Sequence, residues 1–178
     1  MSDNDVNNLI EKKKEAKKSF AKKLSFSYKR PLLGVFLDKE LSGEEAGKIN
    51  EILQGVGSIN MEVIILADSN VDEFSSPHVI FLPYSRANRK TLLEAADMAI
   101  ALPSNDVDEF LLNGIIPVSD QKNGLKDYNP NFETGNSFTY KTDTTWGIFA
   151  ALVRAMETFK FPFDWRNIVR EGVKSAKN

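Results

Sequence analysis

The stretch "PLLGVFLDKELSGEEAGKINEIL", Pro31 to Leu53, decides the fold because it joins a buried strand to a helix. Its first seven residues form an apolar run of the kind that a strand covered on both faces requires. Ser42 is the expected N-cap of the helix, and Glu45 follows at the spacing of a capping box. The apolar stripe of the helix is Ile49, Ile52 and Leu53. A strand, a loop and a helix in this order are the repeating unit of a parallel sheet.

The same alternation continues to the end of the chain. Further strands are expected at 61–67, 78–83, 98–103, 115–120 and 136–141. Further helices are expected at 89–97, 106–114, 144–159 and 165–176. Trp146 and Trp165 fall in the last two helices, where we expect them to anchor helix packing. Continuously apolar strands alternating with helices predict one doubly wound, Rossmann-like α/β domain with a parallel sheet.

Residues 1–28 differ in composition from the rest and are expected to form an N-terminal helical arm, followed by the α/β domain at 29–178. Lysines dominate the segment "EKKKEAKKSFAKKL", and a thin stripe of apolar side chains recurs in it at helical spacing. The pattern predicts a mostly exposed amphipathic helix. Two interpretations stay open: a solvated helix that packs lightly on the domain, or a basic arm for an acidic surface.

The bulk composition excludes several classes of function. A net charge of -2 offers no support for nucleic acid binding, and no apolar run approaches the roughly 20 residues of a membrane helix. The chain has no cysteine, which removes disulfides and thiolate metal sites, and His78 is its only histidine, which leaves no histidine pair for a triad. The N-terminal segment has no apolar core typical of a secretory signal, so a cytoplasmic location is expected.

The stretch "GIIPVSDQKNGLKD", Gly114 to Asp127, raises the question of a ligand. It is a buried strand that ends in a polar loop, at the sheet edge where doubly wound proteins hold their ligands. Gly124 tolerates a positive φ and lets a phosphate approach the main chain, and Asn123 tolerates the same conformation. With Leu125, these residues are the predicted weak ligand-binding loop. Asn-Gly is equally a plain turn signal, and this alternative stays open.

Four segments together resemble, in the same order, the C-terminal half of bacterial glycogen synthases and plant starch synthases. They are "ADMAIALPS", "GIIPVSDQKNGLKD", "GNSFTYK" and "ALVRAMETFKFPFDWRNIVREGV". These families are retaining glucosyltransferases of the GT-B fold that use ADP-glucose. The resemblance spans roughly residues 12 to 175 and implies the Rossmann-like, nucleotide-sugar-binding domain, with the lysine-rich arm corresponding to the interdomain linker.

The chain departs from the family at the donor site. In the family an arginine and a lysine after the first strand neutralise the donor diphosphate, and the matching positions here are Leu37 and Ser42. Lys39 lies close by and is predicted to supply a single cation. Loss of such a charge-assisted clamp costs about 2–4 kcal/mol.

The family's longer loop after the Pro-Ser pair, which carries a glutamate facing the donor sugar, has no counterpart after Ser104. Asp106, Asp108 and Glu109 match no position of that loop, and no catalytic residue, metal site or cofactor is assigned. The family's acceptor-binding domain also has no counterpart in the chain, and without it donor and acceptor cannot be aligned.

Three hypotheses follow from the sequence and its resemblance. The first is a degenerate, standalone glycogen/starch-synthase-like domain that binds a nucleotide-sugar, ADP or phosphate weakly and is not catalytic alone. The second is the donor-binding half of a split glucosyltransferase that transfers glucose from ADP-glucose to a glucan, with a separate chain supplying the acceptor domain. The third is a non-enzymatic protein-interaction module.

Overall fold

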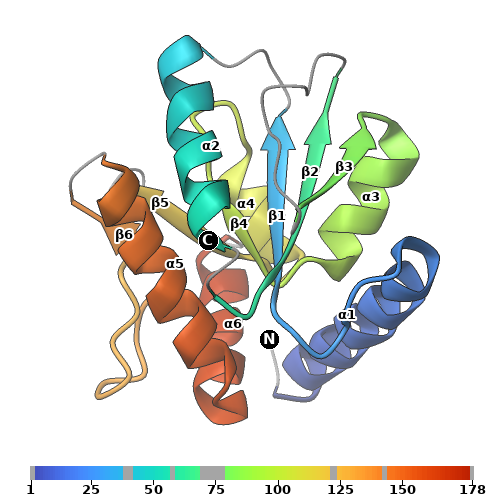
Figure 1. Cartoon of the computed structure of the whole chain (residues 1–178). Coiled ribbons are helices and arrows are strands. Elements are labelled where there is room, and N and C mark those ends of the chain that lie inside the picture. The colour runs from blue at the N-terminus through green and yellow to red at the C-terminus, as the bar shows by residue number, and fades with distance from the viewer. Residues whose placement is uncertain are drawn as a thin grey trace.

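The computed structural model describes residues 3–37, 42–56, 59–68, 79–120, 124–141 and 144–176. Its helices are α1 (Asp3–Leu24), α2 (Gly43–Val56), α3 (Arg86–Ala95), α4 (Val107–Leu112), α5 (Thr145–Phe159) and α6 (Pro162–Ser175). Its strands are β1 (Leu32–Leu37), β2 (Glu62–Ala67), β3 (Val79–Pro83), β4 (Met98–Ile100), β5 (Ile116–Asp120) and β6 (Phe138–Tyr140). The elements predicted from the sequence are all present and in the predicted order (Figure 1).

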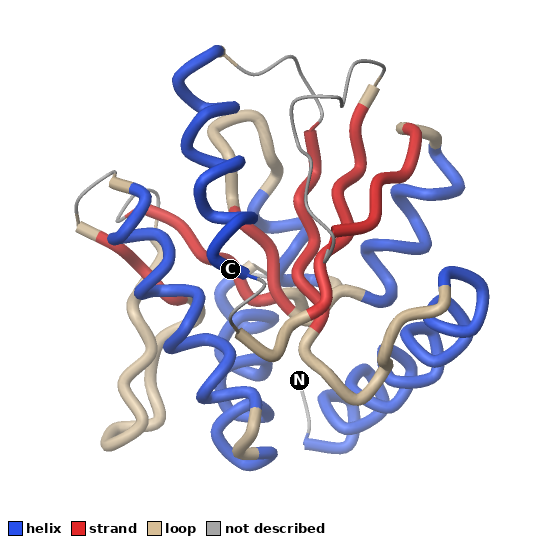
Figure 2. The backbone as a smooth tube through the Cα atoms, in the orientation of Figure 1, coloured by secondary structure: helices blue, strands red, loops and turns tan. Residues whose placement is uncertain are grey.

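The strands form one six-stranded sheet in the order β3-β2-β1-β4-β5-β6. Every neighbouring pair is parallel. Figure 2 shows the sheet in red with helices around it. The chain moves outward from β1 to β3, returns to β4 on the other side of β1, and continues outward to β6. The predicted doubly wound, Rossmann-like fold is therefore confirmed, and its strand order reverses between β1 and β4.

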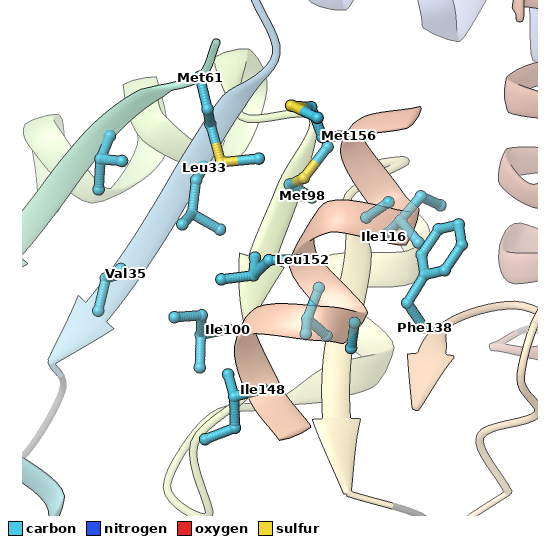
Figure 3. Close-up of a cluster of buried hydrophobic side chains, with 14 of the residues drawn as sticks. Leu33, Val35, Met61, Met98, Ile100, Ile116, Phe138, Ile148, Leu152 and Met156 are labelled. Carbon is cyan, nitrogen blue, oxygen red and sulfur yellow. The ribbon is translucent and has the colours of Figure 1, made fainter. Parts of the chain in front are cut away.

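Alternate residues of each strand pack on opposite faces of the sheet, because side chains of a strand point to the two faces in turn. In β1, Leu33 and Val35 belong to the core on the face covered by α2 and α5, whereas Leu32 and Phe36 belong to the core covered by α3 and α4. Figure 3 shows the first core, in which Leu152 of α5 lies over β4. Burial of each such side chain contributes roughly 1.5–3 kcal/mol.

The first helix, α1, packs on α3 and α6. Val6 and Phe20 of this helix are buried in the two cores, as an amphipathic stripe requires. The same stripe carries two lysines, Lys13 and Lys17, which are only 7% and 5% exposed. The helix is otherwise mostly exposed, as predicted. Its buried lysines are a feature that the sequence analysis did not anticipate.

None of the helices in the described part of the chain combines the length and the hydropathy that a bilayer crossing requires. Trp165 is buried, as predicted, with its ring 5.0 Å from that of Phe159. The same prediction was wrong for Trp146, whose side chain is 80% exposed and which contacts Phe149 edge-on. Trp146 lies in the first turn of α5.

Candidate functional site

A cavity of about 270 Å³ lies at the carboxyl edge of the sheet, beside the reversal of strand order. Its walls are the first turns of α2, the loop that follows β4, the last residues of β5 and β6, and the start of α5. In Figure 1 the arrow tip of β1 and the beginning of α2 mark this edge. In open α/β sheets, ligands bind in the crevice at this position. We name it the switch-point cavity.

The first wall depends on where α2 begins. Ser42 and Glu45 form the predicted capping box: Glu45 Oε2 accepts from the Ser42 main-chain nitrogen at 2.9 Å, and Ser42 Oγ accepts from the Glu45 main-chain nitrogen at 3.3 Å. The box fixes the start of the helix. With that start, Glu45 and Lys48 line the cavity one turn apart, and Lys48 also pairs with Glu44 at 3.0 Å.

The second wall is the loop after β4, which Asn105 ties to the neighbouring strand. Asn105 Nδ2 donates to the carbonyl of Phe36 at 2.9 Å, and Asn105 Oδ1 accepts from the main-chain nitrogen of Leu102 at 2.9 Å. These two bonds hold the end of β1 and the β4 loop together across the reversal of strand order. The wall is therefore fixed by side-chain hydrogen bonds as well as by the sheet.

The acidic residues of this loop serve the local structure. Asp106 Oδ1 accepts from the main-chain nitrogens of Asp108 and Glu109, at 3.0 and 3.2 Å, and so caps α4. The Glu109 carboxylate binds the Arg89 guanidinium of α3 through two bonds, of 2.8 and 2.6 Å. Asp106, at the end of this loop, and Glu109, in α4, thus both have structural partners.

Of the four residues predicted to bind a ligand, Lys39 and Asn123 lie outside the described residues. Leu125 lines the switch-point cavity. Gly124 has a φ of +79°, and a Cβ built on it meets nothing within 4 Å. The space on the Cβ side of its backbone is therefore open. The structure brings Leu125 together with α2 and with the β4 loop, at the sheet edge that the sequence indicated.

The loop leaves the cavity directly after Leu125 and is then anchored to the body of the domain. Asp127 accepts from the Thr139 main-chain nitrogen at 2.7 Å and from Arg154 Nη1 at 2.7 Å. Gly135, with a φ of +106°, packs where a Cβ would clash with the Asp127 carbonyl oxygen. Figure 2 shows the part of the loop that follows Leu125 as a tan segment beside α5. The contacts of Asp127 and Gly135 thus fix the position of the loop next to the cavity.

Most of the polar lining was not predicted from the sequence. Besides Glu45 and Lys48, the cavity is lined by Ser119, Asp120 and Tyr140 at the ends of β5 and β6. The signal that could have found them is their place at the carboxyl end of a predicted strand. Two carboxylates and one ammonium line the cavity among the described residues, so its lining carries a net negative charge. Such a lining favours hydroxyl donors over anions, because carboxylates only accept hydrogen bonds.

Comparisons with known proteins find similarity in structure alone: no family model and no curated protein matches the sequence. A glycosyltransferase from Rickettsia africae superposes with a TM-score of 0.68 at 10% identity, over 92% of this chain and 47% of that one. HepE from Anabaena, solved in complex with UDP and glucose, gives 0.64 at 13% identity, over 92% and 47%. The isolated C-terminal domain of the group 1 glycosyltransferase LpcC from Francisella tularensis gives 0.53 at 10%, over 84% and 87%.

These comparisons define the class of fold. The chain is a Rossmann-like domain of the kind found as the C-terminal domain of GT-B glycosyltransferases. It spans less than half the length of the full-length glycosyltransferases that it matches.

Substitution of Gly124 by alanine is expected to lower the free energy of unfolding by about 1–2 kcal/mol, because an L-residue is strained at this positive φ. Gly124→Asn is the matched control, since asparagine tolerates the left-handed region, and we expect it to cost clearly less. Urea denaturation of both variants measures the difference. Equal stability of the alanine variant and the parent chain would contradict the local geometry at Gly124.

Proposed function

We propose that the chain is a degenerate nucleotide-sugar-binding domain, related to the C-terminal half of glycogen and starch synthases, and that it does not transfer glucose by itself. The observation that carries the proposal is the switch-point cavity, which lies where this fold class places its ligands. In this proposal residues 1–28 correspond to the interdomain linker of the family and residues 29–178 to its nucleotide-sugar domain. The similarity to HepE, solved with UDP and glucose, supports a sugar nucleotide as the class of ligand.

The charge of the lining supports weak binding of the diphosphate. Glu45 and Asp120 face the same cavity as Lys48, the only cation among the described lining residues. Two like charges repel a diphosphate, and one ammonium offsets only part of that repulsion. Lys39 would supply a second cation from the loop that follows β1. The hydroxyl groups of a ribose or glucose, in contrast, can donate to either carboxylate.

The loop after β5 would contribute main-chain contacts to the ligand rather than charged side chains. Gly124 has room for a phosphate or a sugar to approach its backbone, and Leu125 offers an apolar contact within the cavity. Asn123, directly before Gly124, belongs to the same proposed contact. This arrangement accounts for binding, whereas glucosyl transfer also needs an acceptor aligned against the donor.

Titration with ADP and with ADP-glucose is the experiment that tests the proposal. We expect the melting temperature to rise only at millimolar ligand. At a ligand concentration of a hundred times the dissociation constant, the free energy of unfolding should increase by about 2.7 kcal/mol. UDP and UDP-glucose are the matched alternatives for the base. No shift with any of the four ligands would overturn the proposed binding, and synthesis of glucan from ADP-glucose by the purified chain would overturn the proposed lack of catalysis.

Glu45→Gln is the variant that isolates the electrostatic argument. Glutamine also serves in a capping box, so α2 keeps its start while the cavity loses one negative charge. We expect ADP to bind about fivefold more tightly, because the diphosphate senses the lost charge, and adenosine to bind as before, because the glutamine oxygen can still accept from a ribose hydroxyl. Isothermal titration calorimetry measures both. A loss of ADP affinity would mean that Glu45 contacts the nucleotide directly.

A further inference from the structure

A second cavity, of about 380 Å³, lies between α1 and α6 at the amino edge of the sheet. Asp97 and Gly114, which precede β4 and β5, contribute to its lining. In Figure 1, α1 and α6 lie at the ends from which the strand arrows start, opposite the switch-point cavity. Its volume is within the range of small-molecule sites, roughly 300–1,000 Å³. We name it the amino-edge cavity.

The charge of this cavity is opposite to that of the switch-point cavity. Four lysines and one carboxylate line it: Lys13, Lys14, Lys17, Lys29 and Asp97. The excess of positive charge stands out because the chain as a whole has a net charge of -2. Partly buried charges are screened by salt much less than exposed ones. An anion is therefore attracted to the amino-edge cavity rather than to the cavity at the other edge.

The lysines in this cavity differ in how their charge is balanced. Lys17 is neutralised, because its Nζ donates to Asp97 Oδ2 at 2.6 Å. Lys13 contacts no carboxylate among the described residues; its Nζ reaches only the carbonyls of Leu93 and Glu94, at 3.3 and 3.5 Å. An ammonium has three donors, so two long bonds leave at least one hydrogen without a partner in the part of the chain that the structure describes. Burial lowers the pKa of Lys13 to about 8, and the side chain is still mainly charged at pH 7.

The remaining lining of the cavity is apolar. Phe159 and Trp165 contribute aromatic rings that meet edge to face at 5.0 Å, and Ile10 and Val169 add aliphatic surface. Apolar walls beside Lys13, the buried lysine that contacts no carboxylate among the described residues, suit a ligand that has an apolar body and a single negative head group. A strongly hydrated, compact anion such as inorganic phosphate would gain nothing from these walls.

We propose that the amino-edge cavity is a second binding site, for a small amphipathic carboxylate whose apolar body lies against Phe159 and Trp165 and whose carboxylate pairs with Lys13. The carboxylate supplies the partner that the Lys13 ammonium lacks. The site is separate from the switch-point cavity and does not depend on the function proposed for it.

The two tryptophans of the chain allow a direct test. Trp146→Phe removes the exposed one and leaves Trp165, which lines the cavity, as the only indole. We expect 8-bromooctanoate to quench Trp165 fluorescence in a saturable way, and 8-bromooctanol, with the same body and no charge, to bind at least tenfold more weakly. Equal quenching by acid and alcohol would overturn the proposal.

In the same background, Lys13→Met is expected to weaken binding of the acid at least tenfold and to leave the alcohol unchanged. Lys12→Met, on an exposed position of the same helix, is the control for the lost charge and should change neither. Circular dichroism checks that both variants are folded. An unchanged affinity in the Lys13 variant would overturn the role of Lys13.

A pH series on the Trp146→Phe chain keeps the test informative even if Lys13→Met does not fold. The charged groups around Lys13 are Lys17, Asp97 and Glu94, with Lys14 and Lys29 also on the cavity wall. Affinity for the acid should fall at least fivefold between pH 7 and pH 9.5, as Lys13 loses its proton, whereas affinity for the alcohol should not fall. A flat profile for the acid would contradict the proposed pairing.

Discussion

Replacement of Lys17 by methionine is expected to lower the free energy of unfolding by about 3–5 kcal/mol, the largest single effect that the structure predicts. Lys17 is the ionic partner of Asp97, and both side chains are buried, with 6% and 10% of their surface exposed. The same Asp97 oxygen accepts from the main-chain nitrogen of Leu32 at 2.8 Å. Without the lysine, a buried carboxylate keeps one neutral donor and loses its counter-charge.

Two further variants distinguish this cause from a loss of packing. The double variant Lys17→Met with Asp97→Asn should recover most of the stability, because the asparagine oxygen can still accept from Leu32 and the buried carboxylate that lost its lysine is no longer present. Lys18→Met is the surface control: Lys18 pairs with Glu15 at 2.6 Å on an exposed helix face, and its loss should cost far less than the loss of Lys17, because solvent screens an exposed pair. Urea denaturation measures all three. Equal costs at positions 17 and 18 would refute the assignment of a buried ion pair.

The stability of the parent chain is expected to rise relative to that of Lys13→Met as the pH increases from 8 to about 10.5. Burial lowers the pKa of Lys13 in the folded chain to about 8 from 10.5, so in this interval the unfolded chain binds a proton that the folded chain has released. Stability rises with pH wherever the unfolded state binds more protons. A difference of that size corresponds to about 3 kcal/mol.

The difference between the two chains is the informative quantity, because contributions from groups that do not interact with Lys13 are common to both chains and cancel. Below pH 8 the parent bears the full cost of a buried ammonium, and above about pH 10.5 it bears none. The neighbours Asp97 and Glu94 favour the charged form of Lys13, while Lys17 opposes it. Denaturation at pH 7, 9 and 10.5 measures the trend. Lys12→Met, compared with the parent in the same way, should give a flat difference.

The fold was predictable because its signals are local. The β1 run is apolar throughout, and the Ser42–Glu45 capping box marks the start of α2 from residues three apart. The end of a helix was also predictable from the sequence, because glycine readily adopts the positive φ that often follows a helix. Gly114 follows α4 and has a φ of +66°. Each of these features depends on residues that are close together in the sequence.

The buried lysines and the two cavities were not predictable on the same basis. In the sequence, Lys17 cannot be told apart from the many lysines expected to be solvated. Only the folded chain places it beside Asp97, which is 80 residues away in the sequence. Trp146 is of a residue type that usually anchors helix packing, but its side chain on α5 is exposed. The polar lining of the switch-point cavity combines α2, the β4 loop and the ends of β5 and β6. Such long-range encounters follow from topology, and no spacing along the sequence encodes them.

The link between α1 and the sheet has a consequence for how the molecule comes apart. Lys17 Nζ donates to the Arg30 carbonyl at 3.1 Å as well as to Asp97, so one ammonium joins the first helix to the chain entering β1 and to the residue preceding β4. We therefore expect that α1 does not detach from the domain while the strands stay folded. A protease that cuts between residues 25 and 30 would leave α1 attached, and the helical signal should melt together with the sheet in a single cooperative transition.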